Sequence, residues 1–570
     1  MAKLQFRVLY RQFLFRMVDL ELLSQAAQGD IHRLLGRFAA LLIFASLWLT
    51  PVVLGGGGLA AAMGPVLGQI ALWAIEHFLI ATTMLVVGLF AVISWDSMFP
   101  DRRDVLILSP LPIRARTLFL AKAAAVATAL SLTVGVVNLF TSLASPLGLV
   151  PGGGAIPRLR MFGVYWITML AAGAFNFGLV LTIQGIAQLL PRQKFLRVSA
   201  TLQIAAFFLF LSMYFLQLPF ASPAEVLSTQ NRRLIPWLPS YWFLALFQQL
   251  NGLSMPEALG ALARRAWIGL GAAVGGSLAS YLICYLRTLR KIAEQPDILP
   301  GSTALHWLPR FGGSLATAVV QFSIRTLFRS RRHRVTLSFY MGIAFAIVLL
   351  MAKDPALAGV RWHEANLQTI AGSILVMCSA VAGIRVAFAM PIDLRANWIF
   401  RVMPVRGGGR TRAAVRRTLL TLAVAPVWLI AAAILFRMWP WQQAAEHLAV
   451  LGLIGIVVAE TCLKNFRKIP FTCSYLPGKT HFHIAVIIYV VFAFELGSGA
   501  EIERVALVED HRSLAIMLVV FGVATGLLRW RAARLASPLA DSPEEEIEFE
   551  DIPAPAIMVL GLNRDGTSPV

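Results

Sequence analysis

Four polar side chains interrupt long apolar runs of the sequence: Glu76, Gln184, Arg385 and Glu460. Ionisable groups inside such runs are costly to bury in a membrane, and they often mark proton relays, gates or substrate pathways. Arg385 and Glu460 are expected near the same membrane face, where an ion pair between them is one interpretation. A role in gating or substrate passage is the other. Gln184 is also explained by a hydrogen bond between two helices.

Other patterns that could hold a metal or a nucleotide are incomplete. Glu76 and His77 are adjacent, but the second histidine of a zinc-protease helix is absent. The run Gly478-Lys479-Thr480 is similar to the end of a phosphate-binding loop, but Cys473 stands where that loop needs a glycine. We therefore predict no metal site, no cofactor site and no catalytic residue in this chain.

The amino-acid composition indicates what class of protein carries these side chains. The chain has 570 residues, of which 58% are hydrophobic and only 14% charged. Soluble proteins average about 45–50% apolar and about 25% charged residues, so this chain is predicted to be an integral membrane protein. Its net charge of +21 is attributed to loops that face anionic lipids, and nucleic acid is not an expected partner. The four cysteines show no paired spacing and predict no disulfide.

A helix needs about 20 apolar residues to cross a bilayer. The apolar runs predict an all-α protein with about twelve transmembrane helices. The predicted spans are 36–55, 71–95, 118–140, 162–189, 196–218, 264–286, 335–352, 367–390, 414–436, 445–463, 481–499 and 513–530. The glycine runs 55–58 and 152–154 are expected to be outer turns.

The distribution of basic residues predicts how the chain is oriented. With both termini in the cytoplasm, 39 of the 50 Lys and Arg residues lie in cytoplasmic segments and 11 in outer ones. This asymmetry follows the positive-inside rule, and it predicts a multi-pass protein of the bacterial plasma membrane.

Two halves are predicted on either side of a basic connector. Residues 1–290 would form the first six-span half, 291–334 a cytoplasmic connector with a second interfacial helix, and 335–534 the second half. The acidic tail 535–570 is predicted to be disordered. Because each half starts on the same side, the two six-helix repeats would be parallel.

Each half is also expected to begin with an amphipathic helix lying in the membrane interface. The first, predicted over residues 3–26, contains Arg7-Val8-Leu9-Tyr10-Arg11, and its counterpart before span 7 reads Arg325-Thr326-Leu327-Phe328-Arg329. Four-residue spacing places Arg7 with Arg11, and Arg325 with Arg329, on one helical stripe facing lipid phosphates. The simpler interpretation is that both helices only anchor the chain to the membrane surface.

Loops 96–117 and 391–412, after the second span of each half, combine acidic and basic residues between prolines. An orienting signal needs only Lys and Arg, so mixed charge favours docking on another protein over a solvated turn. The candidate docking residues are Asp96, Asp101, Arg102, Arg103, Asp104, Arg114, Arg116, Asp393, Arg395 and Arg401.

This layout resembles the permease of a type 2, exporter-type ABC transporter. The run from Leu111 to Lys122 is similar to that family's approach to span 3, and the outer segment 219–263, with Pro236-Trp237-Leu238-Pro239-Ser240-Tyr241-Trp242-Phe243, fits its outer helices. The resemblance implies that the mixed-charge loops couple to a separate ABC ATPase subunit, present as a dimer, which binds ATP and magnesium. It also implies that this chain moves a substrate and is not itself an enzyme.

The chain departs from the family pattern in three ways. Two halves are fused, the outer loop 500–512 is short, and the second coupling loop lacks counterparts of Asp96 and Asp104. Two alternatives stay open. A secondary transporter of the major facilitator type also has six plus six spans, and Asp101-Arg102 fits its loop after span 2. A membrane-embedded enzyme acting on lipid-linked substrates would need more than the two carboxylates Glu225 and Glu257 of the large outer loop.

Overall fold

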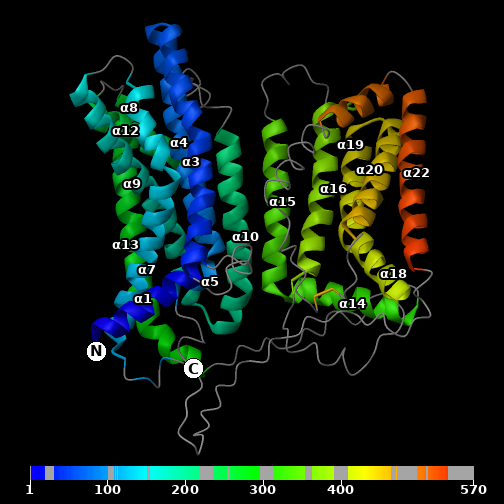
Figure 1. The fold of residues 1–570 in the computed structure, drawn as a ribbon, viewed down its shortest axis with the longest axis horizontal. Coiled ribbons are helices and arrows are strands. Elements are labelled where there is room, and N and C mark those ends of the chain that lie inside the picture. Colours follow the sequence, from blue (N-terminus) through cyan, green and yellow to red (C-terminus); the bar gives the residue numbers. More distant parts are fainter. Residues whose placement is uncertain are drawn as a thin grey trace, which may run out of the picture. The chain divides into compact units, whose positions relative to one another are not determined.

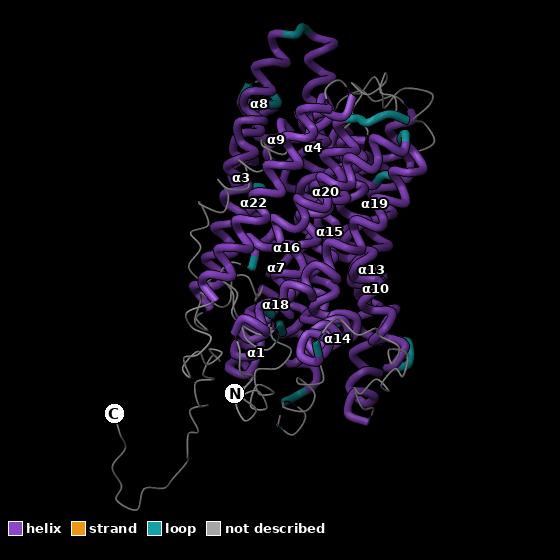
Figure 2. The backbone as a smooth tube through the Cα atoms, turned by 90° about the vertical axis from the view of Figure 1, so that its right-hand side faces the viewer, coloured by secondary structure: helices purple, strands orange, loops and turns teal. Residues whose placement is uncertain are grey.

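A computed structural model shows the chain as an assembly of long helices (Figures 1 and 2). It describes residues 2–18, 31–99, 108, 111, 113–150, 154–217, 235–252, 257–294, 313–352, 363–390, 408–463, 470–471, 497–508 and 511–536. Within these ranges there are helices and no strands. The chain divides into two compact units. Unit 1 comprises Met1–Gly301 with Leu349–Leu357, and unit 2 comprises Ser302–Val348 with Ala358–Val570.

Unit 1 is a bundle built around α4 and α9. Its helices are α1 (Ala2–Val18), α3 (Ile31–Ala62), α4 (Pro65–Ile93), α5 (Trp95–Met98), α7 (Ala115–Val137), α8 (Leu139–Gly148), α9 (Ala155–Gln188), α10 (Arg192–Gln217), η3 (Ile235–Trp237), α12 (Pro239–Asn251) and α13 (Glu257–Glu294). Side chains of α4 and α9 are mostly buried, whereas α3 and α13 are largely exposed. The short helix α12 lies at the opposite end of α4 from α1 (Figure 1).

The predicted outer turn at glycines 55–58 is instead part of α3. Gly57 lets α3 approach α8 closely, because a Cβ atom added to it would lie 1.8 Å from the carbonyl oxygen of Gly148. Glycine is required there because no side chain fits between the two backbones. The sequence interpretation was wrong because it read the glycines as flexibility and not as close helix packing.

Unit 2 is also built of helices in its described segments. Its labelled helices are α14 (Ser314–Arg329), α15 (Arg331–Ala352), α16 (Leu367–Phe388), α18 (Gly408–Leu419), α19 (Ala425–Met438), α20 (Trp441–Cys462) and α22 (His511–Ala536). A π-turn, η7 (Leu420–Val424), joins α18 to α19. Pro426 follows it and lacks the amide hydrogen that a continuous helix would use, which accounts for the widened turn. Residues 497–508 form a further short helix.

The described residues contain eleven helices long and apolar enough to cross a membrane. Large apolar side chains on these helices stay exposed, among them Trp48, Ile268 and Val519. Such a surface is stable in lipid and not in water, so the chain is an all-α, multi-pass membrane protein. The predicted span 481–499 lies almost entirely outside the described residues.

A helix with exposed arginines precedes the first long span of each unit. Helix α1 packs along α7, where the Tyr10 hydroxyl donates to Thr128 Oγ1 at 3.1 Å. Helix α14 packs on α18. Their arginine stripes point away from the bundles: Arg7, Arg11, Arg325 and Arg329 are all exposed. Residues 19–30, which include the end of the predicted first interfacial helix, lie outside the described residues.

Candidate functional site

The predicted coupling loops are described only at their edges. Asp96 lies in α5, while Arg114 precedes α7 and Arg116 lies in its first turn, both exposed. The remaining candidates lie outside the described residues: Asp101, Arg102, Arg103, Asp104, Asp393, Arg395 and Arg401. The structure does describe the helices from which these loops start, together with the contacts of those helices.

In unit 1, the start of the first loop is tied to three other helices through a cluster that we call the Trp95 junction. The Ser94 hydroxyl donates to the Met17 carbonyl of α1 at 2.9 Å, and Trp95 Nε1 donates to Ser199 Oγ of α10 at 2.9 Å. Gln184 of α9 donates to the Trp95 carbonyl at 2.5 Å. Trp95 is fully buried. The Trp95 junction therefore ties the residues that precede the undescribed part of the loop to α1, α9 and α10.

Unit 2 has a corresponding cluster where its second loop starts, the Met390 junction. His333 Nε2, at the start of α15, contacts the Met390 carbonyl at 2.9 Å, and the Phe471 amide donates to the Phe388 carbonyl at 3.0 Å. The Phe471 ring is fully buried and packs edge-on against Phe388, His333 and Phe322 of α14. Here aromatic rings replace most of the hydrogen bonds of the Trp95 junction.

At the other end of unit 1, two polar pairs fasten α12 to α4. Gln248 of α12 donates to the buried Glu76 carboxyl, and His77 Nε2 lies 2.9 Å from Ser240 Oγ. The His77 ring also stacks on Tyr241, with 4.1 Å between ring centroids. Glu76 thus joins helices within the bundle, and its described hydrogen-bond partner is an uncharged amide.

A cavity adjoins these pairs between α4, α9, α10 and α12. Its polar lining comes from Asn176, Tyr214 and Ser240, and its volume is about 60 Å³. Ligand pockets usually measure about 300–1,000 Å³. This cavity has room for water but not for a transported molecule.

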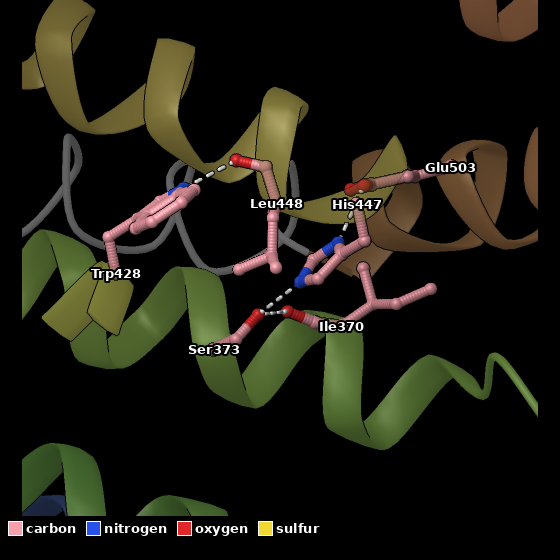
Figure 3. A network of polar contacts seen from close by, with 6 residues as sticks. All are labelled: Ile370, Ser373, Trp428, His447, Leu448 and Glu503. Atoms are coloured by element: carbon pink, nitrogen blue, oxygen red, sulfur yellow. Dashed lines mark hydrogen bonds and ion pairs between the residues drawn. The ribbon is translucent and has the colours of Figure 1, made fainter. Parts of the chain in front are cut away.

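Unit 2 contains a buried chain of three polar side chains that sequence reasoning missed (Figure 3). His447 of α20 lies between Ser373 of α16 and Glu503 of the helix 497–508. Its Nε2 is 2.8 Å from Ser373 Oγ, and its Nδ1 is 2.7 Å from Glu503 Oε1. His447 and Glu503 are essentially inaccessible to solvent. The Ser373 hydroxyl also reaches the Ile370 carbonyl at 2.8 Å.

This order of serine, histidine and carboxylate is that of a hydrolase triad, and the three side chains come from three different helices. Ser373 lies inside a regular helix, and its hydroxyl has a backbone acceptor one turn earlier. The arrangement can hold or pass a proton, because both imidazole nitrogens have polar partners. Glu503 could have been flagged as an acid within the short segment 500–512 that was predicted to be an outer loop, but its pairing with His447 depends on tertiary packing.

The predicted pair Arg385 and Glu460 lies at one end of unit 2. Arg385 Nε donates to the Cys462 carbonyl at 3.0 Å. Glu460 Oε1 forms ion pairs with Arg416 Nε at 3.1 Å and Arg529 Nε at 3.7 Å. Arg385, near the end of α16, therefore reaches the end of α20, where Glu460 also lies. The ion pairs described for Glu460 come from α18 and α22.

Among the described residues, no group of three or more His, Cys, Asp or Glu side chains could hold a metal ion. Comparisons with protein-family models, with curated proteins and with solved structures found no match to this chain.

Proposed function

We propose that this membrane protein is the permease of an ABC exporter, driven by ATP hydrolysed in separate ATPase subunits. The observation that carries the proposal is the Trp95 junction. The predicted coupling loop starts one residue after Trp95, and the junction links that start to α1, α9 and α10. A push on the loop by an ATPase would therefore be passed to several spans as one movement.

Two further features support this function. Both units have a helix with exposed arginines before the first long span, and both have a short helix fastened by a buried histidine at the far end. These are the positions where the resembled family has its interfacial and outer helices. The substrate is not specified by these features, and export is the direction that the resemblance implies.

The first test asks whether the chain has an ATPase partner. The full-length protein is purified from native membranes, reconstituted in lipid nanodiscs and assayed for ATP hydrolysis. We expect an ATPase subunit to co-purify. Reversing two loop charges, with Asp101→Lys and Arg103→Glu, should lower its recovery at least tenfold while membrane insertion is unchanged.

Arg437→Glu, an exposed charge at the end of unit 2 away from the Met390 junction, is the control and should leave ATPase recovery unchanged. Absence of any co-purifying ATPase from the wild-type protein, or wild-type recovery with the double variant, would contradict the proposal. Trp95→Phe separates docking from coupling: we expect the ATPase to bind normally but its stimulation by the permease to fall about three- to tenfold.

A proton-driven secondary transporter is the second candidate, and the buried Ser373–His447–Glu503 chain is the observation that favours it. Buried ionisable groups of this kind form proton relays in pumps and transporters. Transport that continues without ATP, collapses with the proton gradient and is lost in Glu503→Gln would favour this function over the ABC permease.

A further inference from the structure

Arginines concentrate at one end of the unit 2 spans. Contacts define this end: His333 at the start of α15 meets Met390 after α16, and Arg385 near the end of α16 meets Cys462 at the end of α20. Glu460 lies here, and it is the one carboxylate in the described segments at this end. The arginines here are Arg331, Arg332, Arg334, Arg385, Arg412, Arg416, Arg417, Arg529 and Arg531.

The opposite end of unit 2 has mixed charge. Arg437, Arg504 and Arg512 are accompanied there by Glu364, Glu446, Glu501 and Glu503. By the positive-inside rule, the arginine-rich end faces the cytoplasmic leaflet, which carries the anionic lipids.

Glu460 gathers two of these arginines from different helices. Arg416 of α18 and Arg529 of α22 both approach Glu460 Oε1, with N–O distances of 3.1 and 3.7 Å. The carboxylate side chain is only 9% exposed, whereas the two arginine side chains are 34% and 44% exposed. The carboxylate is therefore buried beneath two guanidinium groups that reach the protein surface.

The charges of this cluster do not balance. One carboxylate neutralises one guanidinium, so a net positive charge remains, held between three spans near their ends. Both described ion pairs run through the Nε atom, so neither of them uses a terminal Nη group. Two guanidinium groups fixed side by side present planar, paired donors of the kind that bind phosphate oxygens bidentately.

We propose that Arg416 and Arg529, held in place by Glu460, form a binding site for the phosphate of an anionic phospholipid. The lipid source follows from location: the cluster lies within a few residues of the ends of three spans, at the depth of lipid headgroups. The exposed stripes of α1 and α14 are different, because the arginines of each stripe follow a single helix, whereas Arg416 and Arg529 come from two helices and meet at one carboxylate. The site does not depend on coupling to an ATPase.

The test measures lipid binding by the purified full-length protein with native mass spectrometry. Dioleoylphosphatidylglycerol is the anionic probe, and dioleoylphosphatidylcholine is the zwitterionic control. We expect the wild-type protein to retain phosphatidylglycerol at least fivefold better than phosphatidylcholine. The double variant Arg416→Gln/Arg529→Gln should lose most of this preference, and Arg529→Gln alone should reduce it about threefold.

Arg437→Gln, an exposed arginine at the opposite end of the same unit, is the matched control and should keep the wild-type preference. The single variant Arg529→Gln changes a side chain that is nearly half exposed, so it reports on the site even if the double variant does not fold. Unchanged phosphatidylglycerol preference in Arg529→Gln would overturn the proposal. Displacement of the bound lipid by millimolar inorganic phosphate would overturn the assignment to a lipid and indicate a soluble phosphate ligand.

Discussion

Each unit fastens a short helix to its spans through a buried histidine, but the two units do so with different charges. In unit 1, His77 meets the neutral hydroxyl of Ser240, and the neighbouring Glu76 meets an amide of Gln248. In unit 2, His447 meets the carboxylate of Glu503 directly and Ser373 on its other side. The carboxylate lies on the long helix α4 in unit 1 but on the short helix 497–508 in unit 2.

This difference predicts how strongly the stability of each unit depends on its buried histidine. A histidine and a carboxylate can share a proton and remain neutral as a pair, so neither is readily replaced alone. A histidine beside a hydroxyl forms an uncharged hydrogen bond, which contributes about 0.5–1.5 kcal/mol. Unit 2 should therefore depend on its histidine more strongly than unit 1.

The largest expected effect is that of removing the histidine of unit 2. His447→Ala leaves Glu503 buried without the partner that the structure gives it, which should lower the free energy of unfolding by about 3–5 kcal/mol. His77→Ala should lower it by about 1–3 kcal/mol, because it removes only a buried hydrogen bond to a neutral hydroxyl and the stacking on Tyr241. Unfolding by SDS titration in mixed micelles measures both. Equal losses would remove the distinction between the units.

Neutralising the two acids sharpens the same contrast. Glu503→Gln keeps the shape of the side chain but replaces a charge-assisted hydrogen bond, and we expect a loss of about 1.5–3 kcal/mol. Glu76→Gln should change stability by less than about 0.5 kcal/mol, because the new amide can donate to Gln248 Oε1, which has no described partner. The same SDS titration applies. A larger loss for Glu76→Gln than for Glu503→Gln would contradict the comparison.

The junctions at the opposite ends allow a third test. Trp95→Phe keeps an aromatic ring but removes the hydrogen bond to Ser199 and leaves that buried hydroxyl unpaired, which should destabilise unit 1 by about 1–2 kcal/mol. Thermal unfolding of the detergent-purified protein, followed by near-ultraviolet circular dichroism, measures this loss. Ser199→Ala combined with Trp95→Phe should destabilise little further, since both partners of one bond are then gone. Additive losses would show that Trp95 acts through packing alone.

The sequence predicted much of the fold but few of these contacts. Apolar runs locate spans because a bilayer sets their length: residues 36–55 were expected to cross, and Phe38–Ala60 is the observed segment. Partners such as His447 and Glu503 are 56 residues apart, and no local pattern relates them. The glycines of α3 show the same limit, because a flexible turn and a close helix contact use the same residue type. The coupling residues themselves mostly lie outside the described segments, and their role stays a prediction.

The smallest expected difference separates the serines at the two junctions. Ser94 is buried, and its hydroxyl donates to the Met17 carbonyl, so Ser94→Ala leaves that carbonyl without this donor and should lower the free energy of unfolding by about 1 kcal/mol. Ser330, whose hydroxyl contacts His333 Nδ1 beside the Met390 junction, is partly exposed, and water can replace it. Ser330→Ala should therefore lower the free energy of unfolding by less than about 0.5 kcal/mol. If α1 and the coupling loop move as one body, Ser94→Ala should also weaken ATPase stimulation, whereas Ser330→Ala should not; equal effects of both variants on stimulation would mean that the tie between α1 and α5 transmits nothing.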